Sequence, residues 1–248
     1  MKHTSRVAYS IPPGYSNNPK DFVPEDFLDP EWEPGLWHAT TNLPVVLREG
    51  LKSRLELKRK GLGGGIEEED PDLVSVTYNE ARAVEIADML RLVGKIVKNK
   101  ISASDILSEI ESRFMLEITD PSGFEALEKS LPVELPPNIT IDNAEEVYEW
   151  LDKTITTPEE KYEFLQELDD NFSAVGEPTE FIRVGLTADF EDVKYIDPNK
   201  VGIVEVAIRK NARIVHIPDE DEIRVRPEDV VVIAGNELKE IEEKPLLP

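Results

Sequence analysis

Segments that read as β-strands lie near both ends of the chain, with a long helical stretch between them. Two short runs occur at 36–40 and 73–77, and the C-terminal part holds the others, at 181–186, 201–208, 212–217, 223–225 and 230–234. The intervening stretch, from about 80 to 172, has helical periodicity. Any sheet must therefore join strands that are far apart in sequence. This pattern predicts an α+β fold rather than a regular βαβ array.

The first 34 residues are predicted to form a Pro-rich N-terminal arm. Six prolines interrupt any regular element there, and scattered aromatic residues indicate that the arm is pinned to the body. Residues 35–248 are predicted to form one domain that carries a helical insertion at about 92–178. We expect helices in and next to this insertion at 80–98, 104–116, 143–153 and 159–172. A shorter helix is expected near the start of the domain, at 43–51.

Acidic residues outnumber basic residues by 52 to 28, which gives a formal net charge of −24. This charge opposes nonspecific binding to nucleic acid or to anionic lipid. No run approaches the roughly 18 apolar residues of a membrane span, and the N-terminus lacks the apolar segment of a secretion signal. We therefore expect a protein of the cytoplasm, or of a virion if a virus encodes it. With no cysteine and three histidines, no metal site is expected.

Three features with chemically useful side chains lie on or beside predicted strands, at 36–40, 74–77 and 220–225. Taken singly, each has an ordinary structural explanation: a buried histidine, strand residues that lead into a helix cap, and an exposed acidic turn. The helix cap is expected because Thr77-x-x-Glu80 has the form of a capping box at the start of a helix. The candidate functional residues in these features are His38, Thr40, Ser75, Thr77, Glu220 and Glu222.

Together and in this order, the three features resemble the ADP-ribosyltransferase superfamily, which binds NAD in a small split β-sheet. The first motif strand of that family carries an aromatic residue, then His or Arg, then a small residue. The second carries Ser or Tyr before a helix, and a Glu opens a late strand. His38, Ser75 and Glu222 stand at these places. Glu220-x-Glu222 resembles the paired glutamates of the arginine-modifying branch, whereas His38 follows the pattern of the other branch.

The resemblance implies an NAD-dependent mono-ADP-ribosyltransferase that modifies a protein side chain, with arginine favoured. NAD is then a substrate, and the bond between nicotinamide and ribose breaks through an oxocarbenium-like state. A carboxylate beside the ribose stabilises such a state more than it stabilises the ground state. Glu222 is predicted to supply this carboxylate, and Glu220 to orient or deprotonate the acceptor. The protein target is not specified by the sequence.

Further residues are predicted to contact NAD. The resemblance assigns His38 to a ribose hydroxyl and the backbone of Ala39 to the nicotinamide amide. It also assigns Ser75 to the support of Glu222. Tyr78 or Trp37 is the candidate for stacking on nicotinamide. The full predicted set of NAD-binding residues is His38, Ala39, Thr40, Ser75, Thr77 and Tyr78.

Three other functions are compatible with the sequence. The same site would act as an NAD hydrolase if water were the acceptor. RNA 2′-phosphotransfer on a related scaffold would need cations for the phosphates, and few stand near the motifs apart from Arg48 and Arg54. An acidic structural or interaction protein, for example a component of a viral particle, would retain the fold without activity. The Pro-rich arm and the acidic helices favour this last alternative.

Overall fold

The computed structural model describes six stretches of the chain, 32–59, 72–114, 118–131, 133–175, 188–217 and 222–237. The predicted strand at 181–186, the predicted catalytic residue Glu220 and most of the predicted arm lie outside the described residues.

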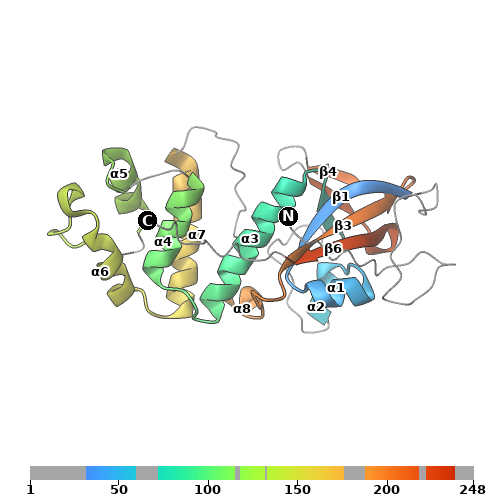
Figure 1. Ribbon diagram of the computed structural model, residues 1–248, viewed down its shortest axis with the longest axis horizontal. Helices are drawn as coiled ribbons and strands as arrows, with labels where there is room; N and C mark the ends of the chain where they lie inside the picture. Colours follow the sequence, from blue (N-terminus) through green and yellow to red (C-terminus); the bar gives the residue numbers. More distant parts are fainter. Residues whose placement is uncertain are drawn as a thin grey trace, which may run out of the picture. The chain divides into compact units, whose positions relative to one another are not determined.

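The described residues fall into two compact units. The first takes in the described residues of 32–53, 73–87 and 199–237, and the second takes in those of 54–72 and 88–198. The strands belong to the first unit, and most of the helices belong to the second (Figure 1). One helix, α3 (Glu80–Val97), begins in the first unit and continues into the second.

The first unit is built on a six-stranded antiparallel sheet in the order β4-β5-β2-β1-β3-β6. Because β2 lies between β1 and β5, the sheet joins segments from the two ends of the chain, and the α+β prediction is confirmed. The strands are β1 (Trp32–Thr40), β2 (Val74–Thr77), β3 (Gly202–Arg209), β4 (Val215–Ile217), β5 (Glu222–Val225) and β6 (Val230–Glu237).

β1 begins at Trp32, ahead of the predicted end of the arm at residue 34. The register of β1 with β3 shifts between Glu33 and Leu36, and Pro34 and Gly35 occupy this irregularity. Gly35 has a φ of +94°, a backbone conformation that favours glycine. Proline is tolerated at such a bulge because no regular ladder bond is lost there. Pro34, which in the sequence suggests that no strand forms here, therefore lies inside a strand.

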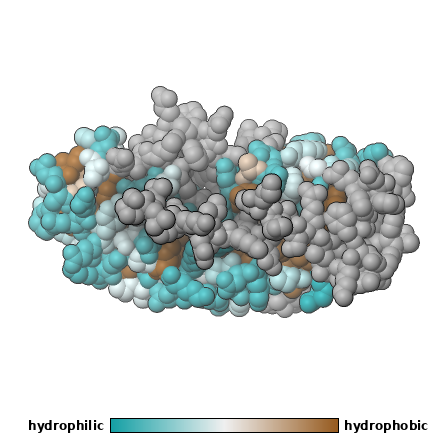
Figure 2. Space-filling view, in the orientation of Figure 1, coloured by the Kyte–Doolittle hydropathy of each residue, from teal (hydrophilic) through white to brown (hydrophobic). Residues whose placement is uncertain are grey.

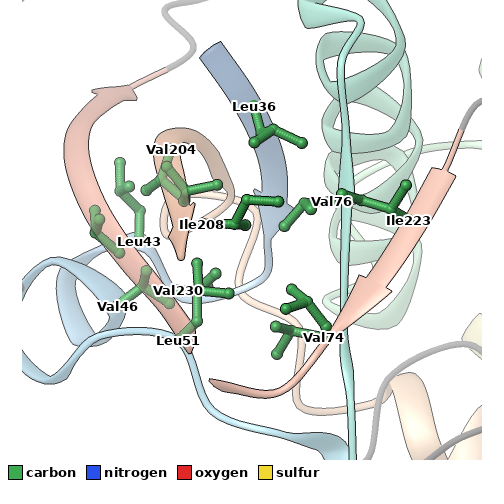
Figure 3. Packing of buried hydrophobic residues seen from close by; sticks show 13 residues of the cluster. Leu36, Leu43, Val46, Leu51, Val74, Val76, Val204, Ile208, Ile223 and Val230 are labelled. Atoms are coloured by element: carbon green, nitrogen blue, oxygen red, sulfur yellow. The ribbon is translucent and has the colours of Figure 1, made fainter. Parts of the chain in front are cut away.

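One face of the sheet packs against α1 (Leu43–Glu49) to form the main core of the first unit. Leu43 and Val46 of this helix belong to the same buried cluster as Leu36, Val76 and Ile223 of the strands (Figure 3). Gly50 ends the helix, as expected from the sequence, and its N–H donates to the carbonyl of Val46 at 2.9 Å. Burial of these aliphatic side chains is the main favourable term in the stability of the sheet.

The second unit is helical. Within it α4 packs against α6 and α7, and α5 packs against α7; the described surface over α5 and α6 is mostly hydrophilic (Figure 2). None of the described helices is long and apolar enough to cross a membrane. The remaining helices are α2 (Arg54–Arg59), α4 (Ala103–Phe114), α5 (Pro121–Ser130), α6 (Glu146–Thr154), α7 (Pro158–Val175) and α8 (Phe190–Val193), with short 3₁₀ turns at Ile141–Asn143 and Pro227–Asp229.

The predicted helices at 80–98, 104–116, 143–153 and 159–172 are present as α3, α4, α6 and α7, with ends shifted by a few residues. The sequence did not lead us to expect α2, α5 or the short helix α8. The start of α5 carried a signal, since Asp120 caps the helix through Ser122 N at 3.2 Å and Pro121 occupies the first helical position.

Gly94 of α3 lies against the chain near Pro198, and we expect its replacement by alanine to destabilise the protein. A Cβ at this position would come within 2.9 Å of the backbone nitrogen of Pro198 and 3.1 Å of Ile196 Cγ2. Alanine normally stabilises a helix interior by about 1 kcal/mol relative to glycine, but overpacking costs about 1–3 kcal/mol. Urea denaturation of Gly94→Ala should show a net loss of about 1 kcal/mol in the free energy of unfolding. A gain in stability would contradict the close approach.

Candidate functional site

The three strands that carry the predicted motifs are neighbours in the sheet. β2 pairs with β1 along one edge, where Trp37 lies opposite Thr77. Along its other edge β2 pairs with β5, where Thr77 lies opposite Glu222. Segments from the two ends of the sequence thus meet side by side at one place.

The register defines which side chains share a face of the sheet. Residues directly opposite each other in antiparallel strands project to the same side, so Trp37, Thr77 and Glu222 form a row across three strands. Leu36, Val76 and Ile223 alternate with this row and belong to the buried cluster on the other face (Figure 3). Glu222 therefore lies on the face opposite the core that α1 covers.

His38 bonds from β1 to the backbone of β2. Its Nδ1 lies 2.7 Å from the carbonyl oxygen of Ser75. A carbonyl only accepts, so Nδ1 carries the proton and donates. Trp37 and Thr77 are the residues paired between β1 and β2. If the pairing continued, Ala39 would lie opposite Ser75, but these two residues are not paired. The imidazole of His38 therefore makes a hydrogen bond to the backbone of β2 just beyond the last paired residues of the two strands.

His38 and Glu222 do not belong to the same face of the sheet. Alternation along β1 assigns His38 to the side of Leu36, as the sequence predicts, and that side is the core face. Ser75 lies opposite Arg224, and the residue opposite Glu222 is Thr77. The structure thus brings His38 into contact with the backbone of Ser75, while the predicted support of Glu222 by the Ser75 side chain stays a prediction.

Glu222 is held by a residue of its own strand. Arg224 Nε donates to Glu222 Oε1 at 2.9 Å, and the two side chains are only 6% and 12% exposed, respectively. The next arginine and glutamate along the chain, Arg226 and Glu228, are 60% and 67% exposed and lie 3.7 Å apart. Because both partners of the first pair are withdrawn from water, each charge is compensated in part by the other. The hydrogen bond also has the length of a charge-assisted bond.

The hydroxyls of two predicted NAD-binding residues close local turns. Thr40 Oγ1 accepts from Asn42 N at 3.2 Å, just before α1. Thr77 Oγ1 accepts from Asn79 N at 3.0 Å, just before α3. The predicted capping box is wrong, because Asn79 Oδ1 caps α3 by accepting from Ala81 N and Arg82 N at 3.0 and 3.3 Å. An asparagine at this position is a common N-cap, and the sequence carried that signal.

The two aromatic candidates differ in their surroundings. Tyr78 is 50% exposed and follows Thr77, the last residue of β2. Trp37 is half-buried and belongs to the same row as Glu222. Trp37 is therefore an aromatic side chain on the face of Glu222.

Arg224 is the residue of this site that sequence reasoning missed. The alternation of Glu222 and Arg224 within a short strand was the available signal, because residues two apart on a strand project to the same face. The signal becomes informative only once that face is known to be buried.

The described residues contain no group of three histidine, aspartate or glutamate side chains arranged to hold a metal ion.

No family model matches the chain, and no curated protein or solved structure matches it either. Function is therefore inferred from the chemistry of the site.

We expect Glu222→Gln to destabilise the protein although it preserves the shape of the side chain. The substitution removes the charge that is paired with Arg224, and loss of one partner of a buried ion pair costs about 3–5 kcal/mol. The expected loss in the free energy of unfolding is about 3 kcal/mol, measured by urea denaturation. Glu228→Gln is the matched control, and its effect should stay within about 0.5 kcal/mol because exposed ion pairs contribute little. Equal effects of the two substitutions would show that the Glu222–Arg224 pair is not a buried pair in solution.

Proposed function

We propose that this protein is an NAD-dependent ADP-ribosyltransferase that acts on a protein side chain, with arginine as the favoured acceptor. The observation that supports the proposal is the register of β1, β2 and β5. It places the three motifs that resemble this superfamily on adjacent strands, although they come from distant parts of the sequence. The hydrogen bond from His38 to Ser75 ties two of these motifs directly.

The proposed reaction exchanges one bond at the anomeric carbon of the nicotinamide ribose. The bond between C1′ and the nicotinamide nitrogen breaks, and its electron pair neutralises the pyridinium as nicotinamide leaves. Positive charge develops on C1′ and the ring oxygen of the ribose. A guanidinium nitrogen of the acceptor then forms the new bond to C1′ and loses a proton, which we assign to Glu220. With water as acceptor, the product would be free ADP-ribose.

Glu222 has properties that suit it to stabilise the developing positive charge. Its carboxylate is largely withdrawn from water, and electrostatic interactions are stronger where the surroundings are less polar. It is also held in place before the reaction begins, so that little reorganisation is needed as charge develops.

His38 and Ala39 are assigned to NAD binding. Since Nδ1 of His38 donates to Ser75, the proposed contact with a ribose hydroxyl uses Nε2, which is an acceptor in this tautomer. Ala39 lies beyond the last paired residue of β1 and β2. Its small side chain allows the nicotinamide amide to approach the backbone.

We expect Glu222→Gln to reduce NAD turnover at least 100-fold, the order of effect seen when one electrostatic contact to a transition state is removed. The assay incubates the purified protein with NAD labelled in the adenylate part, alone and with a cell lysate. Nicotinamide release and label on protein are measured separately, so that hydrolysis and transfer are distinguished. Glu228→Gln should match the wild type.

Full activity of Glu222→Gln would refute the catalytic assignment. If the wild-type protein neither turns over NAD nor shows an NAD-dependent shift in its melting temperature, the proposed enzyme function is wrong, and a non-enzymatic role is favoured.

A pair of variants tests the NAD contact of His38 separately from its structural role. We expect His38→Ala and His38→Asn to weaken NAD binding about tenfold each, the loss of one hydrogen bond. His38→Asn retains a donor for the Ser75 carbonyl but lacks Nε2, so its stability should exceed that of His38→Ala. The dissociation constant is measured by calorimetry with carba-NAD, which cannot be cleaved. Unchanged affinity in both variants would exclude the ribose contact.

A further inference from the structure

We propose that Arg224 is a positioning residue of this site, one that fixes the carboxylate of Glu222 in the orientation needed by the ribose. This inference rests on the proposed function and adds a residue to it. Arg224 is 5% exposed and lies in β5, two residues after Glu222. Strand alternation directs both side chains to the face opposite the core.

The hydrogen bond between the two residues has a direction that matters for the reaction. Arg224 donates through Nε to one carboxylate oxygen of Glu222, Oε1. This contact leaves the second oxygen, Oε2, as the atom to which we assign the hydroxyl of the nicotinamide ribose. A glutamate at the first residue of a strand has several staggered rotamers open to it. The bond to Arg224 selects one of them before the substrate arrives.

The neighbours of Arg224 support a role in orientation. Arg224 lies opposite Ser75 of β2, and Glu222 lies opposite Thr77. Arg224 therefore belongs to a strand that is paired with β2 along its whole length. The carbonyl group that His38 contacts is also part of β2. Orientation of a catalytic group to within about 1 Å can change a rate by about 100-fold. An arginine held in this way is suited to such control.

The test compares Arg224→Met and Arg224→Lys with the wild type. Arg224→Met removes the guanidinium but fills a similar volume, and we expect kcat for nicotinamide release to fall about 30- to 100-fold while KM for NAD stays within about twofold. Arg224→Lys retains the charge without the planar donor geometry and should recover part of kcat. Arg226→Met removes the exposed arginine two residues further on and serves as the matched control, with unchanged kcat and KM. Urea denaturation and circular dichroism establish the folded fraction of each variant.

The possible outcomes separate this inference from the proposed function. An inactive wild-type protein would overturn both. An active wild type with unchanged kcat in Arg224→Met would overturn the positioning role alone. A higher kcat in that variant would also overturn it, because the arginine would then block the carboxylate. If Arg224→Met does not fold, Arg224→Lys decides: a reduced kcat at constant KM supports the inference, and wild-type kcat refutes it.

Discussion

The pairing of β2 with β1 on one edge and with β5 on the other is the interaction on which both the sheet and the site depend. β2 is only four residues long, yet it connects β4 and β5 to the rest of the sheet. Its two valines, Val74 and Val76, are buried in the core, while Thr77 links Trp37 to Glu222 through the register. Burial of one face of this short strand therefore fixes which residues meet on the other face.

The net charge of the protein says less about its site than the position of individual charged side chains does. The chain has an excess of acidic residues, and many of them are exposed, where a carboxylate is fully hydrated and easily accommodated. Glu222 is different because it is largely buried and shares a hydrogen bond with an almost fully buried arginine. Such an arrangement contributes little to stability compared with a well-packed apolar pair. The hydrogen bond fixes the position of the Glu222 carboxylate, and the proposed function requires such a fixed carboxylate.

The sequence predicts the class of fold and most of its elements because hydrophobic periodicity is a local property. Strand order and register depend on pairing between distant segments, so the row of Trp37, Thr77 and Glu222 could not be derived from spacing alone. Pro34 concealed the start of β1 because a bulge accommodates it. Arg224 was missed for a related reason: an arginine two residues after a glutamate has no special meaning until the face they share is known to be buried.

The assignment of His38 and Glu222 to opposite faces places a geometric requirement on the proposed reaction. A single dinucleotide that contacts both side chains has to pass from one face of the sheet to the other, and a continuous backbone ladder would prevent this. Between the described strands β1 and β2, the ladder ends after Trp37 and Thr77, and beyond it His38 replaces a backbone donor at Ser75. The split sheet expected from the resemblance would begin at this point. The proposed function therefore requires NAD to bind at the end of this ladder, beside Ala39, where backbone groups of β1 and β2 no longer bond to each other.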